Sequence, residues 1–243
     1  MISKLTHHNC WYRKFCQNVD SVHCVDVCPS FYEMKHLFEQ SGIPENLFGT
    51  ISLQPDDTDL AAFIELKSIK DNIRDFVQSG QNLYIWGEAT GNGKTSWSIK
   101  LLQSYFHAIH AGNGLKARGF FIHTPSFMID CKHHFDNHNS LDYKMVKIVD
   151  HQGTDLLTMT NLLNVDLIVW DEIGPTNLSQ YEYATLLSIL DQRCLRGKSN
   201  IFTSNLSIQQ LEDKLGNRIM SRMSNDLKII ELRGFDRRRG GSV

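Results

Sequence analysis

A glycine-rich segment that ends in a lysine and a threonine is the part of the sequence with the clearest chemistry. It follows an apolar run at 83–85 and precedes a helical pattern, and its key residues are Gly91, Gly93, Lys94 and Thr95. Glycines allow backbone N–H groups to turn toward an anion, and the start of the following helix adds positive charge. The segment therefore predicts a phosphate-binding loop in which Lys94 contacts the β- and γ-phosphates of a nucleotide and Thr95 binds Mg²⁺.

The start of this loop departs from the strict pattern. G-x-x-x-x-G-K-T requires a glycine at position 88, but the chain has Glu88 there and Gly87 one residue earlier. We therefore expect a loop that is one residue longer than usual. Asn92 and Ser96 complete the set of loop residues expected to contact the nucleotide. The alternative is an ordinary glycine-rich turn between a strand and a helix.

Two adjacent carboxylates, Asp171 and Glu172, end a second apolar run, at 167–170. At the end of a buried strand, Asp171 is placed to hold Mg²⁺ through water beside Thr95. Glu172 is placed to orient and deprotonate the water that attacks the γ-phosphate. A plain turn before a helix would explain the same pair of residues, but the phosphate loop upstream favours nucleotide hydrolysis.

Three small polar residues, Thr203, Ser204 and Asn205, end the next apolar segment. In a parallel sheet of order 5-1-4-3-2, this strand lies between the strand before the phosphate loop and the strand before the carboxylates. One of the three residues is then expected to face the γ-phosphate, and we choose Asn205, with Ser204 and Thr203 as alternatives. A turn-forming Ser-Asn pair accounts for the same residue types.

Arginines near the end of the sequence are candidates for a charge-stabilising role. Arg218 and Arg222 lie four residues apart and share one face of a predicted helix. An arginine presented to the nucleotide of another subunit stabilises the charge of the transition state; the alternative is a basic surface face. Arg238 lies in a basic run after the last predicted strand, where we expect it to reach the nucleotide; a basic run that is only solvated is the alternative. Because the chain has no guanine-reading Asn-Lys-x-Asp motif, the expected nucleotide is ATP.

Four of the six cysteines cluster near the N-terminus, at Cys10, Cys16, Cys24 and Cys28. In a reducing compartment thiols favour metal over disulfides, and four thiolates complete the tetrahedral shell of a structural Zn²⁺. The cluster therefore predicts a zinc site, and unbridged thiols in a small helical module are the alternative. The histidines that could replace one cysteine are His7, His8 and His23.

The elements that must position these residues alternate between strand and helix patterns. The predicted strands cover 82–86, 119–123, 166–170, 200–204 and 227–232, and the helices between them cover 94–110, 126–135, 178–196 and, as short pieces, 207–225. This alternation predicts an α/β fold with a parallel sheet covered on both faces. Ligands of such sheets bind at the carboxyl ends of the strands, where the phosphate loop lies.

The N-terminal third is expected to be organised separately. A helical pattern over 31–40 ends at Ser41-Gly42-Ile43-Pro44, and two prolines and an acidic turn follow before a helix over 60–79. We predict a zinc-binding helical module at 1–40, a linker and connecting helix at 41–75, and the nucleotide-binding domain at 76–243.

Composition limits the class of protein. The chain has 243 residues and a formal net charge of −2, so any contact with nucleic acid must come from a local basic patch. The first ten residues contain no apolar signal-peptide core, and no apolar run approaches the roughly 18 residues of a membrane span. We therefore expect a cytoplasmic protein that does not contact membranes.

Taken together, the motifs resemble those of the AAA+ ATPases of the DnaC/DnaI type, the bacterial and phage helicase loaders, which are related to IstB-like ATPases. The segments that carry the resemblance are 91–95, 169–174, 202–205 and 217–222, together with 41–44 and, more weakly, the cysteine module. The resemblance implies a P-loop NTPase of AAA+ type with a 5-1-4-3-2 sheet. It also implies that no C-terminal lid is present, and only residues 233–243 follow the last predicted strand.

The resemblance also implies a function. In this family the N-terminal module binds the hexameric replicative helicase, and the ATPase domain binds single-stranded DNA and associates with itself. The implied roles are phosphate and Mg²⁺ binding for Lys94, Thr95 and Asp171, catalysis for Glu172, sensing for Asn205, and the arginine finger for Arg222 with Arg218 beside it. The competing functions are an ATPase partner of a transposase, a helicase-binding regulator that needs no turnover, and a small-molecule phosphotransferase.

Overall fold

The structure is a computed structural model. It describes residues 10, 13, 16, 19, 21, 24, 28–48, 51–55, 57–111, 116–138, 159–174 and 177–234. Among the helices of these segments, none combines the length and the apolar character that crossing a bilayer requires.

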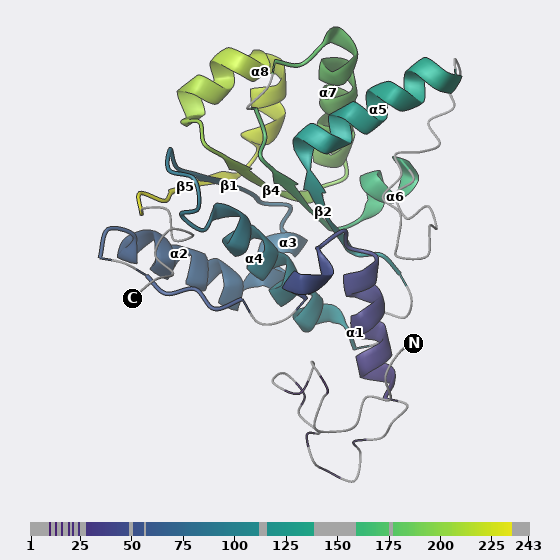
Figure 1. The fold of residues 1–243 in the computed structure, drawn as a ribbon, viewed down its shortest axis with the longest axis vertical. Coiled ribbons are helices and arrows are strands. Elements are labelled where there is room, and N and C mark those ends of the chain that lie inside the picture. The colour runs from purple at the N-terminus through teal and green to yellow at the C-terminus, as the bar shows by residue number, and fades with distance from the viewer. Residues whose placement is uncertain are drawn as a thin grey trace.

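Five parallel strands form one sheet (Figure 1). They are β1 (Asn82–Trp86), β2 (Gly119–His123), β3 (Leu167–Asp171), β4 (Ser199–Ser204) and β5 (Leu227–Glu231). The strand order is β2-β3-β4-β1-β5, which reads 5-1-4-3-2 from the other edge. The strand before the phosphate loop and the strand before the carboxylates therefore both adjoin β4.

Helices cover both faces of the sheet (Figure 1). One face carries α1 (Pro29–Glu39), α2 (Leu60–Asp71), α3 (Ile73–Gln78) and α4 (Lys94–Ile109), which share one buried apolar cluster. The other carries α5 (Thr124–His138), α6 (Met159–Asn164), α7 (Gln180–Leu195) and α8 (Ile208–Met223), which share a second. The sheet is therefore covered on both faces, as the alternating pattern predicts.

Two helical regions differ from the sequence prediction. The helix predicted over 60–79 is divided between α2 and α3, because Asn72 leaves the helical conformation (φ −114°, ψ 28°) and its side chain donates to the carbonyl of Ser68 at 2.9 Å. Helix α6 was not predicted. Helix α8 is broken at Gly216, with φ 74° and ψ 160°, in agreement with the prediction of short helices there.

The N-terminal segment packs on the nucleotide-binding domain. The apolar face of α1 is buried, and Phe38 meets Phe106 of α4 with ring centroids 5.6 Å apart. The chain then crosses the edge of β2, where Phe121 N–H donates to the carbonyl of Ser41 at 2.6 Å. Further on, Lys100 of α4 donates to the carbonyl of Ile51 at 2.9 Å. The residues after α1 are thus tied to β2 and α4, while the predicted domain boundaries stay a prediction.

The four N-terminal cysteines lie within the described residues and are partly exposed. Cys10, Cys16 and Cys28 pack against the apolar cluster that contains α1. Across the described residues, no three or more His, Cys, Asp or Glu side chains come together in an arrangement that would hold a metal ion. The zinc site therefore stays a prediction.

Candidate nucleotide-binding and hydrolysis site

The predicted phosphate loop lies between the buried strand β1 and helix α4. Gly91 and Gly93 have φ of 72° and 103°, in the left-handed region that side chains with a Cβ avoid. Helix α4 begins at Lys94, directly after Gly93. The loop thus turns sharply into the helix, and its backbone N–H groups lie at the positive end of the helix dipole.

The glycine at the start of the loop has a different role from the phosphate-facing glycines. A Cβ atom at Gly87 would lie 2.0 Å from the carbonyl oxygen of Leu232, which follows β5, and 2.6 Å from Nδ2 of Asn92. The Leu232 N–H in turn donates to the carbonyl of Trp86 at 2.7 Å. The glycine at position 87 therefore allows the end of β5 to pack against the loop.

The side chains of Asn92 and Lys94 are buried inside the loop. Lys94 Nζ donates to the carbonyls of Gly87 (2.7 Å) and Ala89 (2.8 Å) and to Oδ1 of Asn92 (3.0 Å). Asn92 Nδ2 donates to the carbonyl of Leu232 at 2.8 Å. The ammonium group is thus held at the loop, and the Asn92 side chain contacts Lys94 and the end of β5.

Thr95 and Asp171 come together as the sequence predicts. Thr95 Oγ1 donates to Oδ1 of Asp171 at 2.9 Å, and Thr203 Oγ1 donates to the same oxygen at 2.6 Å. Burial raises the pKa of the Asp171 carboxyl, and the bonds from Thr203 and Thr95 oppose that rise. A hydroxyl and a carboxylate beside a phosphate loop are the oxygen ligands that Mg²⁺ prefers, so these residues fit the ion.

Glu172 follows β3 in a left-handed backbone conformation, with φ 57°. Its N–H donates to Oγ1 of Thr203 at 3.0 Å, so Thr203 contacts both residues of the carboxylate pair. The Glu172 side chain is 56% exposed, and its Oε2 lies 3.2 Å from Nε2 of His123 at the end of β2. Nδ1 of His123 lies 2.8 Å from Oγ of Ser126.

His123 is a site residue that the sequence analysis missed. The available signal was its place at the end of β2, which pairs in register with Asp171 at the end of β3. Among the three residues proposed as the sensor, Thr203 contacts Asp171, Ser204 donates to the carbonyl of Ile173 at 2.7 Å, and Asn205 is exposed beyond β4.

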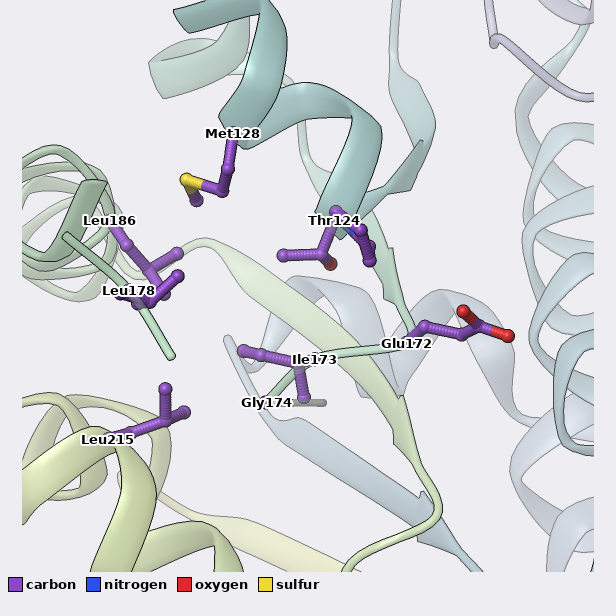
Figure 2. Close-up of a pocket in the computed structure, with 9 residues that line it drawn as sticks. Thr124, Met128, Glu172, Ile173, Gly174, Leu178, Leu186 and Leu215 are labelled. Carbon is purple, nitrogen blue, oxygen red and sulfur yellow. The ribbon is translucent and has the colours of Figure 1, made fainter. Parts of the chain in front are cut away.

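A small pocket lies beside Glu172 on the sheet face covered by α5, α7 and α8. Figure 2 shows Met128, Leu186 and Leu215 around it and the Glu172 carboxylate directed away from these apolar side chains. Thr124 Oγ1 is buried at the pocket and has no hydrogen-bond partner among the described residues. The pocket is therefore lined mainly by apolar side chains, and the Glu172 carboxylate lies at its margin.

The two predicted finger arginines lie on α8, after the break at Gly216. Arg218 and Arg222 are both exposed, and Arg222 forms an ion pair with Asp191 of α7. Arg238 lies outside the described residues.

The fold and the loop together define an α/β protein with a phosphate-binding loop after the first strand of a parallel sheet. The family model described as "IstB-like ATP binding protein" matches residues 132–234, a range that includes Asp171 and Glu172 and begins after the phosphate loop. The replicative helicase loader DnaC of Buchnera aphidicola subsp. Baizongia pistaciae is 39% identical over 70 residues, which are 29% of this chain and 28% of that protein. The match thus spans less than a third of this relative's length.

Solved structures share the fold. The crystal structure of the DnaC helicase loader matches with a TM-score of 0.56 and 18% identity, covering 82% of this chain and 99% of that chain. A putative primosome component from Streptococcus pyogenes serotype M3 matches with a TM-score of 0.55 and 25% identity, covering 83% and 97%. Together with the family model and the DnaC relative, these matches confirm the resemblance to the DnaC-type helicase loaders that the motifs predict.

Proposed function

We propose that this chain is an ATP-dependent DNA replication factor that loads a hexameric replicative helicase onto single-stranded DNA. The observation that carries the proposal is the contact between Thr95 and Asp171, which brings a phosphate loop and a carboxylate pair into one site. The names of the relatives support the choice of helicase loading among the functions that use such a site.

The proposed chemistry is hydrolysis of ATP to ADP and phosphate. Lys94 binds the β- and γ-phosphates, and Thr95 and Asp171 hold Mg²⁺, which neutralises phosphate charge when bound. Glu172 orients the attacking water and accepts its proton. Thr203 is placed to fix both carboxylate residues, and Asn205 stays the proposed contact to the γ-phosphate.

We further propose that ATPase domains associate with one another, with Arg222 of one copy serving the nucleotide of the next and Arg218 beside it. Arg238 is proposed to reach the nucleotide of its own chain. Single-stranded DNA is expected to bind a local basic surface, because the chain as a whole carries a net charge of −2.

The N-terminal module, residues 1–40, is proposed to bind the helicase, with residues 41–75 connecting it to the ATPase domain at 76–243. Four thiolates, from Cys10, Cys16, Cys24 and Cys28, would complete a structural Zn²⁺ site. Support for zinc comes from the clustering of these four cysteines in the sequence.

A loading assay tests the main proposal. A purified replicative helicase is mixed with this protein, ATP and circular single-stranded DNA carrying an annealed oligonucleotide, and oligonucleotide release is measured. The wild-type chain is expected to increase release, and Lys94→Ala, which lacks the cation for the phosphates, is expected to fail. If the wild-type chain binds ATP but neither binds the helicase nor changes release, helicase loading is wrong for this chain.

One alternative is favoured by a specific observation: the family model over 132–234 takes its description from IstB-like proteins, so an ATPase partner of a transposase is the second candidate. Capture of partners from cells that express the tagged chain separates the two, because a loader is expected to retain a replicative helicase and the alternative a transposase. Glu172→Gln removes the proposed general base. If this variant supports helicase loading at the wild-type rate, the chain is a helicase-binding regulator that does not need ATP turnover.

A further inference from the structure

Arg222 is bound to the neighbouring helix through one edge of its guanidinium group. Its Nε lies 2.5 Å from Oδ1 of Asp191 on α7, and the two side chains are 43% and 41% exposed. A guanidinium group carries five N–H donors in one plane, and Nε supplies a single one of them. The contact therefore leaves the two terminal nitrogens, with four N–H groups, for another acceptor.

Helix α7 holds Asp191 at a fixed place. Arg193, two residues further along α7, is fully buried and donates to four acceptors at 2.7 to 3.0 Å, three backbone carbonyls around the amino ends of β3 and β4 and Oδ1 of Asn200. These bonds fasten the end of α7 to the sheet. Asp191, half a turn away, is consequently a rigid attachment point on the surface.

The second half of α8 presents its arginines outward. After the break at Gly216, Ile219 and Met223 are buried against the core, whereas Arg218 and Arg222 are exposed. A long arginine side chain on such a surface samples many rotamers unless a contact fixes it. Asp191 supplies that contact for Arg222, and Arg218 has no equivalent ion pair among the described residues.

We propose that Asp191 is a positioning residue for Arg222. By holding Nε, it orients the guanidinium plane so that the terminal nitrogens bind the γ-phosphate of a nucleotide in a second copy of this chain. The inference rests on the proposed function, in which Arg222 acts between copies. It adds Asp191 as the residue that orients the Arg222 side chain before two copies associate. Lysine has no planar fork with which to contact a carboxylate and a phosphate together, so Arg222→Lys is expected to fail despite keeping the charge.

A mixing experiment on the full-length chain isolates the effect. Arg222→Ala copies keep a working phosphate loop, Lys94→Ala copies supply the arginine, and their mixture is assayed for ATP hydrolysis in the presence of single-stranded DNA. Asp191→Ala is then added to one partner at a time. In the arginine-supplying Lys94→Ala copy it is expected to lower kcat by about tenfold with little change in KM, because orientation and not nucleotide binding is lost.

Three controls exclude a general loss of structure. Asp191→Ala in the copy that already lacks Arg222 is expected to leave the ATP hydrolysis rate of the mixture unchanged. Asp213→Ala, which removes another exposed carboxylate, on the first half of α8, is expected to have no effect in either copy. Asp191→Asn, which keeps the oxygen acceptor, is expected to restore part of the rate, and melting temperatures check that each variant is folded.

The outcomes separate this inference from the proposed function. If the Arg222→Ala and Lys94→Ala mixture is active and Asp191→Ala in the arginine-supplying copy leaves its rate unchanged, the positioning role of Asp191 is wrong and the action of Arg222 between copies stands. If the mixture without any Asp191 change is inactive while the wild-type chain hydrolyses ATP, both the role of Arg222 and that of Asp191 are overturned.

Discussion

The Thr203 hydroxyl is the group whose removal tests the site most sharply, because it joins the two carboxylate residues. It donates to Asp171 Oδ1 at 2.6 Å and accepts from the Glu172 N–H at 3.0 Å. Thr203→Val replaces the hydroxyl by a methyl group of similar size at a position that is 1% exposed. The substitution therefore removes two hydrogen bonds with little change in packing.

The expected loss of stability follows from these two bonds. A hydrogen bond to a carboxylate contributes about 1.5–3 kcal/mol and a neutral one about 0.5–1.5 kcal/mol, so the free energy of unfolding at neutral pH is expected to fall by about 2–4.5 kcal/mol. Turnover is expected to fall as well. Without its partner, the Glu172 N–H no longer fixes the strained backbone at φ 57° that aims the carboxylate.

Urea denaturation and steady-state ATPase assays measure both effects. Thr203→Ser keeps the hydroxyl and is expected to retain most of the stability and rate, whereas Thr203→Val loses both. Asn205→Ala serves as the comparison, because Asn205 is exposed beyond β4. The reasoning is refuted if Thr203→Val matches the wild-type chain in stability and rate while Asn205→Ala abolishes turnover, since Asn205 would then be the group that matters.

Three further predictions concern the loop, the helix interface and the cysteine module. Gly87→Ala is expected to destabilise the fold by about 1–3 kcal/mol through overpacking against the end of β5, and to weaken ATP binding measured by calorimetry. If the variant keeps the wild-type stability and ATP affinity, the close packing of β5 against Gly87 is wrong. His107 lies on α4 where it meets α1, with its ring centroid 6.1 Å from that of Phe38, and burial lowers its pKa to about 4. In the unfolded chain the pKa of this histidine is about 6.5. Its contribution to the free energy of unfolding is therefore complete above pH 6.5 and is lost as the pH falls toward 4, so the free energy of unfolding is expected to drop by about 2 kcal/mol from pH 7.5 to 5. In urea denaturation at a series of pH values, His107→Leu is expected to remove this part of the dependence of unfolding free energy on pH. If the dependence is unchanged, other groups cause it. Zinc removal, or Cys24→Ser with Cys28→Ser, is expected to unfold residues 1–40, because metal binding supplies about 10–16 kcal/mol in comparable sites; metal analysis that finds no zinc in protein purified without chelator contradicts the site.

The sequence predicts those parts of the fold that depend on local patterns. Apolar runs, helical periodicity and the glycines of the loop place all five strands and the start of α4 within a residue or two. The proximity of Thr95 and Asp171 also follows, because parallel strands align their carboxyl ends. Local patterns fail where a short element depends on its neighbours, as for α6 and for the break at Asn72.

Contacts between distant segments account for what the sequence does not predict. The glycine at position 87 looks like an irregular phosphate-loop glycine until the end of β5 is placed against it, and the Asn92–Leu232 bond that accompanies this approach spans 140 residues. No local rule pairs these residues. The same holds for Arg193, whose burial depends on carbonyl acceptors in α6, at Val165 between α6 and β3, and in β4.

The contact between His123 and Glu172 shows how strand order decides the state of the site. β2 adjoins β3 on the side opposite β4, whereas the phosphate loop follows β1, which lies beyond β4. A Glu172 carboxylate bound to His123 is therefore directed toward the edge of the sheet and not toward the loop, while Asp171 and Thr95 already meet. In the proposed reaction the Mg²⁺ ligands are thus assembled in advance, and the general base must exchange its histidine contact for the attacking water.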